Sequence, residues 1–330
     1  MSNVGQQLLS GALSGLATTI CLQPFDFLKT RVQQEDGVLR PKNSAVIWNT
    51  ARHVVATNGV TGLWRGTAAS LVRNVPGVAL YFTTLTQLRG IMATSPYFVI
   101  VRQKVSNGQG SGNASVLPKL SNQGNLLAGA TTRVGVGFIL NPFSVLKARF
   151  ESNMYAYESL FGALKSIARQ GPSELLRGFL ASSLRDAPYA GLFVVFYEGI
   201  KRETGTSSIV PGQAVFFERP LHFVAEVLHI STSAQSSVLH SVAAASASAL
   251  ATAITHPFDV IKTKIQVRSE ARYNGLLRTA HTIWAQRGAV GFLDGLSLRM
   301  ARKVGSSAIG WAVYEALLMF LHRSRALKDP

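Results

Sequence analysis

QPFDFLKTR, at residues 23–31, is the stretch of sequence that decides the fold, because the chain contains it three times. Its diverged copies align without gaps as NPFSVLKAR at residues 141–149 and HPFDVIKTK at residues 256–264. The prolines of successive copies are 118 and 115 positions apart (142 − 24 and 257 − 142). One such match would be weak, but three at a regular spacing indicate an internally repeated fold.

A second motif follows each copy in the same order. It reads NGVTGLWRG at residues 58–66, QGPSELLRG at residues 170–178 and RGAVGFLDG at residues 287–295. Three pairs of matching motifs, always in one order, indicate three copies of a single unit. We therefore divide the chain into repeats at residues 1–100, 101–210 and 211–330.

Each repeat is expected to form a helical hairpin. The apolar segments predict helix pairs at residues 7–34 and 68–90, 122–150 and 180–201, and 238–266 and 297–321. Because Pro removes a backbone donor and can bend a helix, kinks are predicted at Pro24, Pro142 and Pro257. Between the helices of each pair, short amphipathic stretches are expected at residues 46–56, 159–168 and 276–285. The predicted fold class is an all-α membrane protein with six transmembrane helices in three pseudo-threefold repeats.

The composition favours a membrane environment. Of the 330 residues, 47% are hydrophobic and only 15% are charged, and the mean hydropathy is positive. Residues 2–25 carry no charge and are interpreted as a first membrane helix, because no basic segment precedes them as in a signal peptide. Elsewhere Pro, Gly and single charges interrupt the apolar segments, which is tolerated where a membrane helix faces a cavity or a neighbouring helix.

Other functional classes fit the sequence less well. The formal net charge of +17 could suit a nucleic-acid-binding protein, but the basic residues occur singly or in pairs and form no basic helix. The seven scattered histidines have no metal-ligand spacing and no nucleophile stands beside a base, so we expect neither an enzyme nor a metal or cofactor. The single cysteine, Cys21, excludes an internal disulfide and is expected to be a buried small hydrophobe.

Basic residues also predict an orientation in the membrane. The segments within the hairpins, 34–65, 151–177 and 267–295, hold four, three and four Lys or Arg residues. The loops between hairpins, 90–120 and 201–236, hold three each. The positive-inside bias therefore places the segments within the hairpins on the interior side.

A stripe of polar residues runs along one face of the first helix. Asp26, Lys29 and Gln33 are spaced i, i+3 and i+7, so they share a face that must contact protein or water. An intrahelical pair of Asp26 with Lys29 is one interpretation, and it would contribute at most a few tenths of a kcal/mol. Repetition in all three odd-numbered helices favours the alternative, a ring in which each carboxylate meets the lysine of another helix.

These motifs resemble the mitochondrial carrier family over almost the whole chain. The family signature Pro-x-[Asp/Glu]-x-x-[Lys/Arg] is complete in the first and third repeats, but Ser144 replaces the acid in the second. The resemblance implies a matrix gate made of the ion pairs Asp26 with Lys147 and Asp259 with Lys29, of Lys262 facing Ser144, and of the braces Gln33, Gln266 and Glu151. We expect Glu151 to replace the missing acid electrically and to pair with Lys262 or Lys264.

A second gate is implied on the cytoplasmic side, by the family pattern [Phe/Tyr]-[Asp/Glu]-x-x-[Lys/Arg] on the even-numbered helices. Only YEGIK at residues 197–201 matches it completely, with Glu198 and Lys201 as the charged pair. The counterparts keep only Arg89 and Glu315 of the charged positions. A gate with so few ion pairs would open at lower cost, and two gates that are never open together give alternating access.

Substrate selection is expected where the threefold pattern breaks. Each even-numbered helix carries an arginine followed by a different residue: Arg73 by Asn74, Arg185 by Asp186 and Arg302 by Lys303. Arg185 and Asp186 together suit the carboxylate and the ammonium of a zwitterion, and they resemble the contact signature of amino-acid carriers. Arg133 is an isolated arginine within a membrane helix and is a further candidate. The alternatives are a shared structural role for the three arginines, pairing of Arg185 and Asp186 within a gate, and snorkelling of Arg133 to an interface.

The second repeat narrows the resemblance. NPFSVLKARFES at residues 141–152 and YAYES at residues 155–159 are similar to the glycine-transporting subgroup of the family. This implies glycine uptake across the mitochondrial inner membrane into the matrix, where glycine supplies haem precursor synthesis. A carrier for another small amino acid or a carboxylate metabolite is the alternative. The resemblance further implies a monomer in contact with lipid such as cardiolipin, both termini on the intermembrane-space side, and no nucleic-acid partner.

Overall fold

The computed structural model describes residues 3–36, 43–94, 122–157, 159–203, 232–306 and 309. Every regular element among these residues is helical. The elements are α1 (Asn3–Gln34), α2 (Asn43–Asn58), η1 (Val60–Trp64), α3 (Thr67–Ala93), α4 (Asn122–Ile139), α5 (Asn141–Glu151), α6 (Leu160–Arg169), α7 (Pro172–Leu175), α8 (Phe179–Glu203), α10 (Thr232–Ile254), α11 (His256–Val267), η2 (Ala271–Tyr273), α12 (Leu276–Arg287), η3 (Gly288–Leu293) and the helical residues 296–306. No helix in this part of the chain combines the length and the apolar composition expected of a membrane span.

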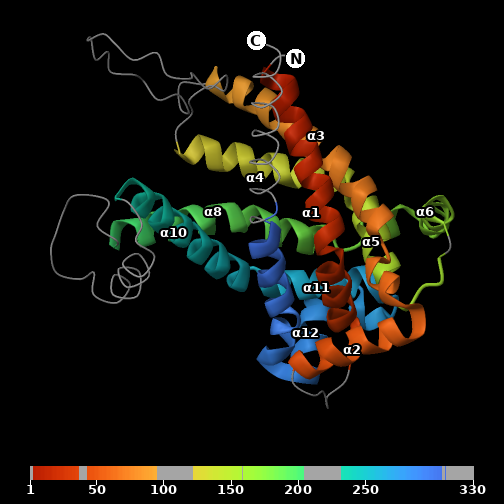
Figure 1. The fold of residues 1–330 in the computed structure, drawn as a ribbon. Coiled ribbons are helices and arrows are strands. Elements are labelled where there is room, and N and C mark those ends of the chain that lie inside the picture. Colours follow the sequence, from red (N-terminus) through yellow and green to blue (C-terminus); the bar gives the residue numbers. More distant parts are fainter. Residues whose placement is uncertain are drawn as a thin grey trace, which may run out of the picture.

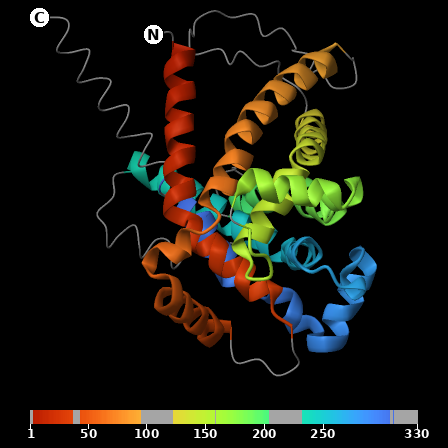
Figure 2. The same ribbon diagram turned by 90° about the vertical axis from the view of Figure 1, so that its right-hand side faces the viewer.

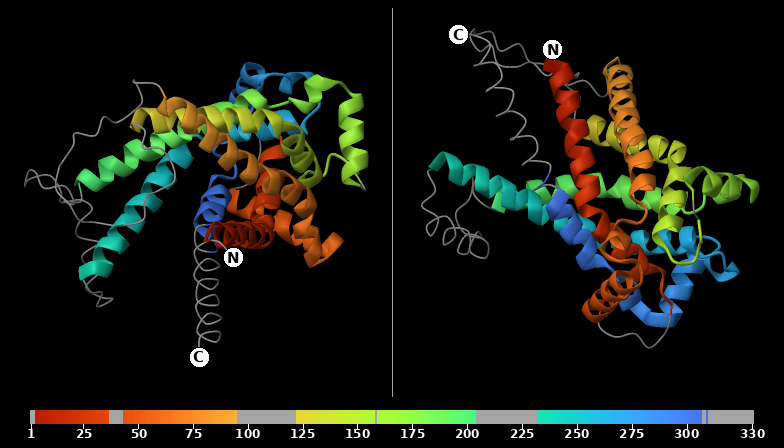
Figure 3. Two further views of the ribbon diagram at one scale, coloured as in Figure 1. Left: turned by 90° about the horizontal axis from the view of Figure 1, so that it is seen from above. Right: turned by 45° about the vertical axis from the view of Figure 1, so that its right-hand side comes forward.

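The long helices pack against one another in chain order (Figure 1, Figure 2). α1 contacts α3, α3 contacts α4, α4 contacts α8, and α8 contacts α10. Residues 296–306 close the circle, because Gly305 lies against Leu22 of α1 and Arg299 donates to the carbonyl of Thr252 in α10. Figure 3 shows the long helices diverging from the end of the molecule where α2 and α12 lie.

The observed helices follow the predicted ranges. The predicted pairs correspond to α1 with α3, to α4 and α5 with α8, and to α10 and α11 with residues 296–306. The predicted amphipathic stretches correspond to α2, α6 and α12. Most of the last predicted helix, at residues 297–321, lies outside the described residues.

Most of the apolar core consists of small clusters at the end of the molecule that holds the short helices, and a further cluster joins α3 to α4. The clusters at that end join Ala163 and Ile167 of α6 to Val145 and Leu146 of α5, Ile283 of α12 to Val260 and Ile261 of α11, and Val46 of α2 to Val32 of α1 and Leu298. Burying each large aliphatic side chain contributes about 1.5–3 kcal/mol. These clusters fix α1, α5 and α11, the three helices that carry the charged motifs.

The three prolines of the repeated motif do not act alike. α4 ends before Asn141 and α10 ends before His256, and a new helix begins there with Pro142 or Pro257 in its first turn. α1 runs through Pro24 without interruption. The same kink was predicted at all three prolines. In the structure Pro24 lies inside a continuous helix, whereas Pro142 and Pro257 lie at the start of a new one.

Trp64 accounts for this difference. Pro24 has no N–H group, so the carbonyl of Ile20, four residues earlier, loses its helical donor. The indole Nε1 of Trp64 donates to that carbonyl at 2.8 Å. The residues at the same place in the other two motifs are Leu176 and Leu293, whose side chains carry no donor. A continuous α1 therefore depends on a contact that only the first repeat can make.

A tight turn recurs three times, and each time it ties a helix that carries the charged motif (α1, α5 or α11) to the segment leading into the second helix of the predicted pair (α3, α8 or residues 296–306). The residue before the proline bonds to the backbone carbonyl that precedes a glycine: Gln23 to Arg65 at 3.1 Å, Asn141 to Arg177 at 3.2 Å and His256 to Asp294 at 3.0 Å. The glycines, Gly66, Gly178 and Gly295, have φ values of 88°, 74° and 76°, a region that favours glycine. At Gly178 a Cβ atom would also lie 2.9 Å from Cγ of Gln266, so the glycine lets α11 approach.

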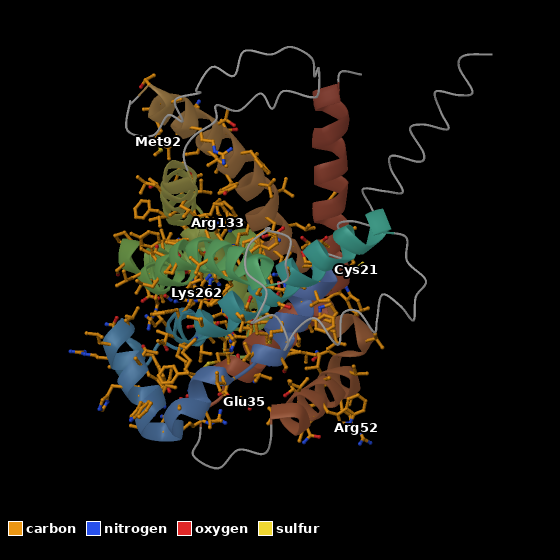
Figure 4. All side chains as sticks on the ribbon, turned by 90° about the vertical axis from the view of Figure 1, so that its left-hand side faces the viewer. Cys21, Glu35, Arg52, Met92, Arg133 and Lys262 are labelled. Atoms are coloured by element: carbon orange, nitrogen blue, oxygen red, sulfur yellow. The ribbon has the colours of Figure 1, made fainter. Side chains whose placement is uncertain are left out.

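Cys21 is exposed on α1, as Figure 4 shows, and the expectation that it is buried was wrong. The following residues Leu22 and Gln23 are buried instead. The phase of the helix turns these two side chains inward and the thiol outward, which the apolar composition of the segment does not reveal.

Candidate functional site

Two adjoining cavities lie between the long helices, with volumes of about 290 Å³ and about 510 Å³. Nine cationic side chains and four carboxylates line the smaller cavity, an excess of five positive charges. Such a field favours an anion or the carboxylate end of a zwitterion. The cavities bring together all seven residues predicted to contact substrate and eight of the nine predicted for the matrix gate, the exception being Gln33.

Asp26 of α1 forms ion pairs with two cationic side chains from other parts of the chain. Lys147 Nζ on α5 lies 2.6 Å from its carboxylate, and Arg302 Nε lies 2.5 Å from the same group. The lysine is the one that the resemblance paired with Asp26. The arginine was expected to contact substrate, and here it joins the charge network.

Asp259 of α11 is bound in the same way. Lys29 Nζ on α1 lies 2.5 Å from the carboxylate, and Arg185 Nη1 on α8 lies 2.8 Å from it. Gln33 adds a hydrogen bond from Nε2 at 3.3 Å, which places this residue beside the pair. The Asp259 side chain is only 1% exposed, so its charge depends on these partners.

The third position of the ring carries no acid. Ser144 Oγ accepts a hydrogen bond from Gln266 Nε2 at 3.4 Å. Lys262, its expected neighbour, lines both cavities together with Ser144 and is 8% exposed. Among the residues that the structure describes, Lys262 has no hydrogen-bond or ion-pair partner for its ammonium group.

Arg185 and Asp186 are bonded to each other. The guanidinium donates from Nε and Nη2 to both carboxylate oxygens of Asp186, at 2.7 and 2.8 Å. Because Nη1 binds Asp259, Arg185 bridges two carboxylates on different helices. The Asp186 side chain is 32% exposed, the highest value among the four carboxylates of the smaller cavity.

Glu151 does not replace the missing acid, so this part of the prediction was wrong. Its carboxylate accepts hydrogen bonds from Gln23 Nε2 at 3.0 Å and from Thr30 Oγ1 at 2.7 Å, and it lies 3.6 Å from Lys147 Nζ. Lys264, one of the two expected partners, instead binds Asp36 at 2.6 Å. Two turns beyond Ser144, the same face of α5 points toward α1, whereas the expectation required it to point toward α11.

The remaining predicted contacts line the cavities from several helices. The guanidinium carbon of Arg133 lies 5.2 Å from the ring centre of Tyr81, in a cation–π contact, and Figure 4 shows Arg133 between Met92 and Lys262. Asn74 donates to Thr19 at 3.2 Å and accepts a hydrogen bond from Arg73 at 3.3 Å. Lys303 donates to the hydroxyl of Tyr189 at 3.2 Å.

The cytoplasmic gate falls largely outside the described residues. Glu315 is not described, and neither are the side chains of Glu198 and Lys201. Arg89 lies on α3, and the described part of the chain places no ion-pair partner beside it. This gate stays a prediction.

Two charge clusters at the end of the molecule that holds the short helices were missed by the sequence analysis. Glu174 binds both Arg149 and Arg177, and these contacts lower its pKa although partial burial alone would raise it. Asp36 binds Lys264 and accepts a hydrogen bond from Tyr273 at 2.5 Å. The only available signal was the recurrence of basic residues after each motif.

Helices that surround a charged cavity, with ion pairs joining one helix to another across it, are compatible with a solute carrier. The chain belongs to the mitochondrial carrier protein family, which matches residues 1–96, 118–208 and 233–325. Membership makes it a transporter and not an enzyme, and places it in the mitochondrial inner membrane.

Several similar proteins carry the name mitochondrial glycine transporter. One from Laccaria bicolor is 65% identical over 328 residues, which cover 98% of this chain and 100% of that protein. One from Coccidioides immitis is 41% identical over 95% of this chain and 89% of that protein. One from Neosartorya fischeri is 40% identical over 97% of this chain and 91% of that protein.

Proposed function

We propose that this protein imports glycine into the mitochondrial matrix by alternating access, and that the glycine supplies haem precursor synthesis. Relatives named mitochondrial glycine transporter, matched over 91–100% of their length, support the substrate. The observation that carries the proposal is the charge pattern of the smaller cavity, in which a large cationic excess surrounds four carboxylates, of which Asp186 is the most exposed. A zwitterion matches this pattern better than a simple anion does, because it also has an ammonium group to place.

Glycine binds in this proposal with its ammonium on Asp186. As expected from the sequence, its carboxylate binds Arg185 and is also contacted by Arg73 or Arg133. The remaining substrate contacts come from Asn74, Arg302 and Lys303. Glycine has no side chain to grip, so discrimination comes from lack of room. One extra methylene changes binding by about 1–3 kcal/mol, which disfavours alanine and strongly disfavours larger amino acids.

The ion pairs across the cavity form the matrix gate in this proposal. Asp26 with Lys147 and Asp259 with Lys29 join helices that must separate when the matrix side opens. The cytoplasmic gate uses Glu198, Lys201, Glu315 and Arg89. Because a ligand shifts two states only by its differential affinity for them, bound glycine must offset part of the cost of separating these pairs.

We also propose the membrane arrangement expected from the sequence. Six transmembrane helices form three repeats at residues 1–100, 101–210 and 211–330, with α2, α6 and α12 on the matrix side and both termini on the intermembrane-space side. The three family matches and the threefold recurrence of the turn contacts support the repeats. The protein acts as a monomer, with lipid such as cardiolipin bound at its surface.

Reconstitution tests the substrate directly. Purified protein in liposomes should take up labelled glycine, and a panel of unlabelled competitors should rank glycine first, alanine well behind it and larger amino acids last. Uptake of another small amino acid or a carboxylate metabolite, without glycine uptake, would establish the alternative substrate. Liposomes without protein give the background.

A further inference from the structure

The two acids of the charge ring follow one rule. Asp26 in the first repeat binds Lys147 of the second repeat and Arg302 of the third. Asp259 in the third repeat binds a lysine of the first and an arginine of the second. Each acid therefore receives the lysine of the next repeat and the arginine of the repeat after that.

The same rule defines a third set of residues around position 144. An acid there would receive Lys262, the lysine of the third repeat, and Arg73, the arginine of the first. The chain has Ser144 instead. All three residues line both cavities, so the set is assembled around open space although its acid is missing.

Among the described residues, neither cation of this set forms a direct ion pair with a carboxylate. Within the described part of the chain, Arg73 makes a single hydrogen bond, to the amide oxygen of Asn74 at 3.3 Å, and its buried Nε atom has no partner. Lys262 has no ion pair or hydrogen bond with any described side chain, and it lies near the like charges of Arg185 and Arg73 as well as the opposite charges of Asp186 and Asp259. Asp186 forms no ion pair with either cation, and each of its two oxygens already accepts a hydrogen bond from Arg185. Two desolvated cations without an anion are costly, and a ligand carboxylate would relieve that cost.

We propose that the carboxylate of the substrate takes the place of the missing third acid, bound between Lys262 and Arg73 and within reach of the Ser144 hydroxyl. This inference rests on the proposed function but moves the main carboxylate contact from Arg185 to Lys262 and Arg73, because the guanidinium of Arg185 is already bound to Asp186 and Asp259. Ser144 carries a hydroxyl where Asp would carry a carboxylate, and its smaller side chain borders the open space of both cavities, where a ligand carboxylate can lie. The bound carboxylate then gives Lys262 and Arg73 the anion that Asp26 and Asp259 provide for the other two pairs of cations. Substrate binding and the state of the matrix gate are therefore coupled.

A permanent acid at the empty position tests the proposal. Ser144→Asp supplies the carboxylate from the protein, and Ser144→Asn is its neutral isosteric reference. In proteoliposomes, we expect Ser144→Asp to have a KM for glycine at least tenfold above that of Ser144→Asn. Without glycine it should also unfold at a higher temperature than Ser144→Asn, because Lys262 and Arg73 gain a partner, and adding glycine should stabilise it less. Equal KM values and equal stabilisation by glycine in the two folded variants would overturn the proposal.

A second comparison decides the matter if Ser144→Asp does not fold. Lys262→Gln should raise the KM for glycine at least tenfold over wild type, and an unchanged KM would overturn the proposal. Methylamine has the ammonium group of glycine without the carboxylate, so it should not raise the unfolding temperature of the wild-type protein. Stabilisation by methylamine equal to that by glycine would also count against a carboxylate receptor.

The proposed function can fail separately. If wild-type protein takes up another small carboxylate and not glycine, the substrate assignment is wrong, and the Ser144→Asp and Ser144→Asn comparison is repeated with that labelled solute. If wild type takes up glycine normally and the two variants do not differ, only the inference about the third acid is wrong.

Discussion

Trp64 donates its indole N–H to the carbonyl of Ile20 across 2.8 Å, and this contact replaces the donor that Pro24 removes from α1. The hydrogen bond explains why the first odd-numbered helix is continuous whereas the other two are divided beside their prolines. It also fixes the motif at residues 58–66 against α1, close to the turn that Gln23 forms with Arg65.

Replacing this tryptophan should destabilise the protein. Trp64→Phe keeps an aromatic ring but removes the donor, so we expect a loss of about 1 kcal/mol and a lower unfolding temperature in detergent. Trp48→Phe is the matched control, because Trp48 lies on α2 with 69% of its surface exposed. Equal unfolding temperatures for the two variants would show that the indole hydrogen bond contributes nothing.

The glycine of the second turn should not tolerate a side chain. Gly178 has a φ of 74°, and a Cβ atom there would lie 2.9 Å from Cγ of Gln266. Gly178→Ala should cost about 1–3 kcal/mol through backbone strain and overpacking. Gly191→Ala on α8 is the control, since an added Cβ meets nothing within 4 Å and alanine favours a helix. A thermal shift assay on both variants checks this, and a Gly178→Ala protein as stable as Gly191→Ala would contradict the role of the turn.

The sequence was sufficient for most of the helices that the structure describes. The apolar segments predicted the helix ranges, and the shared face of Asp26, Lys29 and Gln33 predicted that these side chains meet other helices. The motif spacing could not show how α3, α8 and residues 296–306 are rotated about their axes relative to the charged residues of α1, α5 and α11. For that reason the contact of Arg302 with Asp26 was missed, because it depends on helix rotation and not on spacing.

Departures from the repeat were harder to place. Ser144 and Glu151 lie two turns apart on one face of α5. We expected this whole face to point toward the same neighbouring helix. The neighbouring helix changes along that length, so Glu151 meets Gln23 and Thr30 and not Lys262. The role of Trp64 was unpredictable for a related reason, since its partner is a backbone carbonyl that only the three-dimensional arrangement brings within reach.

Part of the loss of stability at low pH should come from protonation of Asp36. Partial burial alone would raise the pKa of this carboxyl, but hydrogen bonds from Lys264 and Tyr273 and nearby positive charges hold it below the usual value of 3.8. A carboxyl with a lowered pKa in the folded state stabilises the protein fully above its ordinary pKa, and the contribution is lost as the pH falls through the lower folded value. Wild-type protein should therefore lose part of its stability as the pH falls below about 4.

The variant Asp36→Asn isolates this contribution. It should unfold at a lower temperature than wild type at neutral pH, and the difference should shrink as the pH falls below about 4, because the wild-type carboxyl becomes neutral there. Melting curves between pH 7 and pH 3 provide the measurement. A difference that stays constant over this range would mean that packing, and not charge, explains the effect of the substitution.

Arg185 should not be replaceable by lysine. Its guanidinium binds Asp186 through two nitrogens and Asp259 through the third, so one planar group connects two carboxylates. A lysine ammonium is a compact charge on a flexible chain and does not reproduce this fork. Arg185→Lys should therefore reduce glycine uptake and lower the unfolding temperature without glycine.

Asp186→Asn should act differently, because it leaves the contact between Arg185 and Asp259 intact. It removes the charge that faces the substrate ammonium in the proposed function, so the folded variant should lose uptake and not merely bind glycine more weakly. The reason is that binding must help to separate the closed gate, and a substrate held at one end only supplies less of that energy. Uptake by proteoliposomes containing each variant, with folding checked by thermal unfolding, decides the matter. Normal uptake by both folded variants would remove the pair from the site and leave Arg73, Arg133 and Arg302 to hold the substrate.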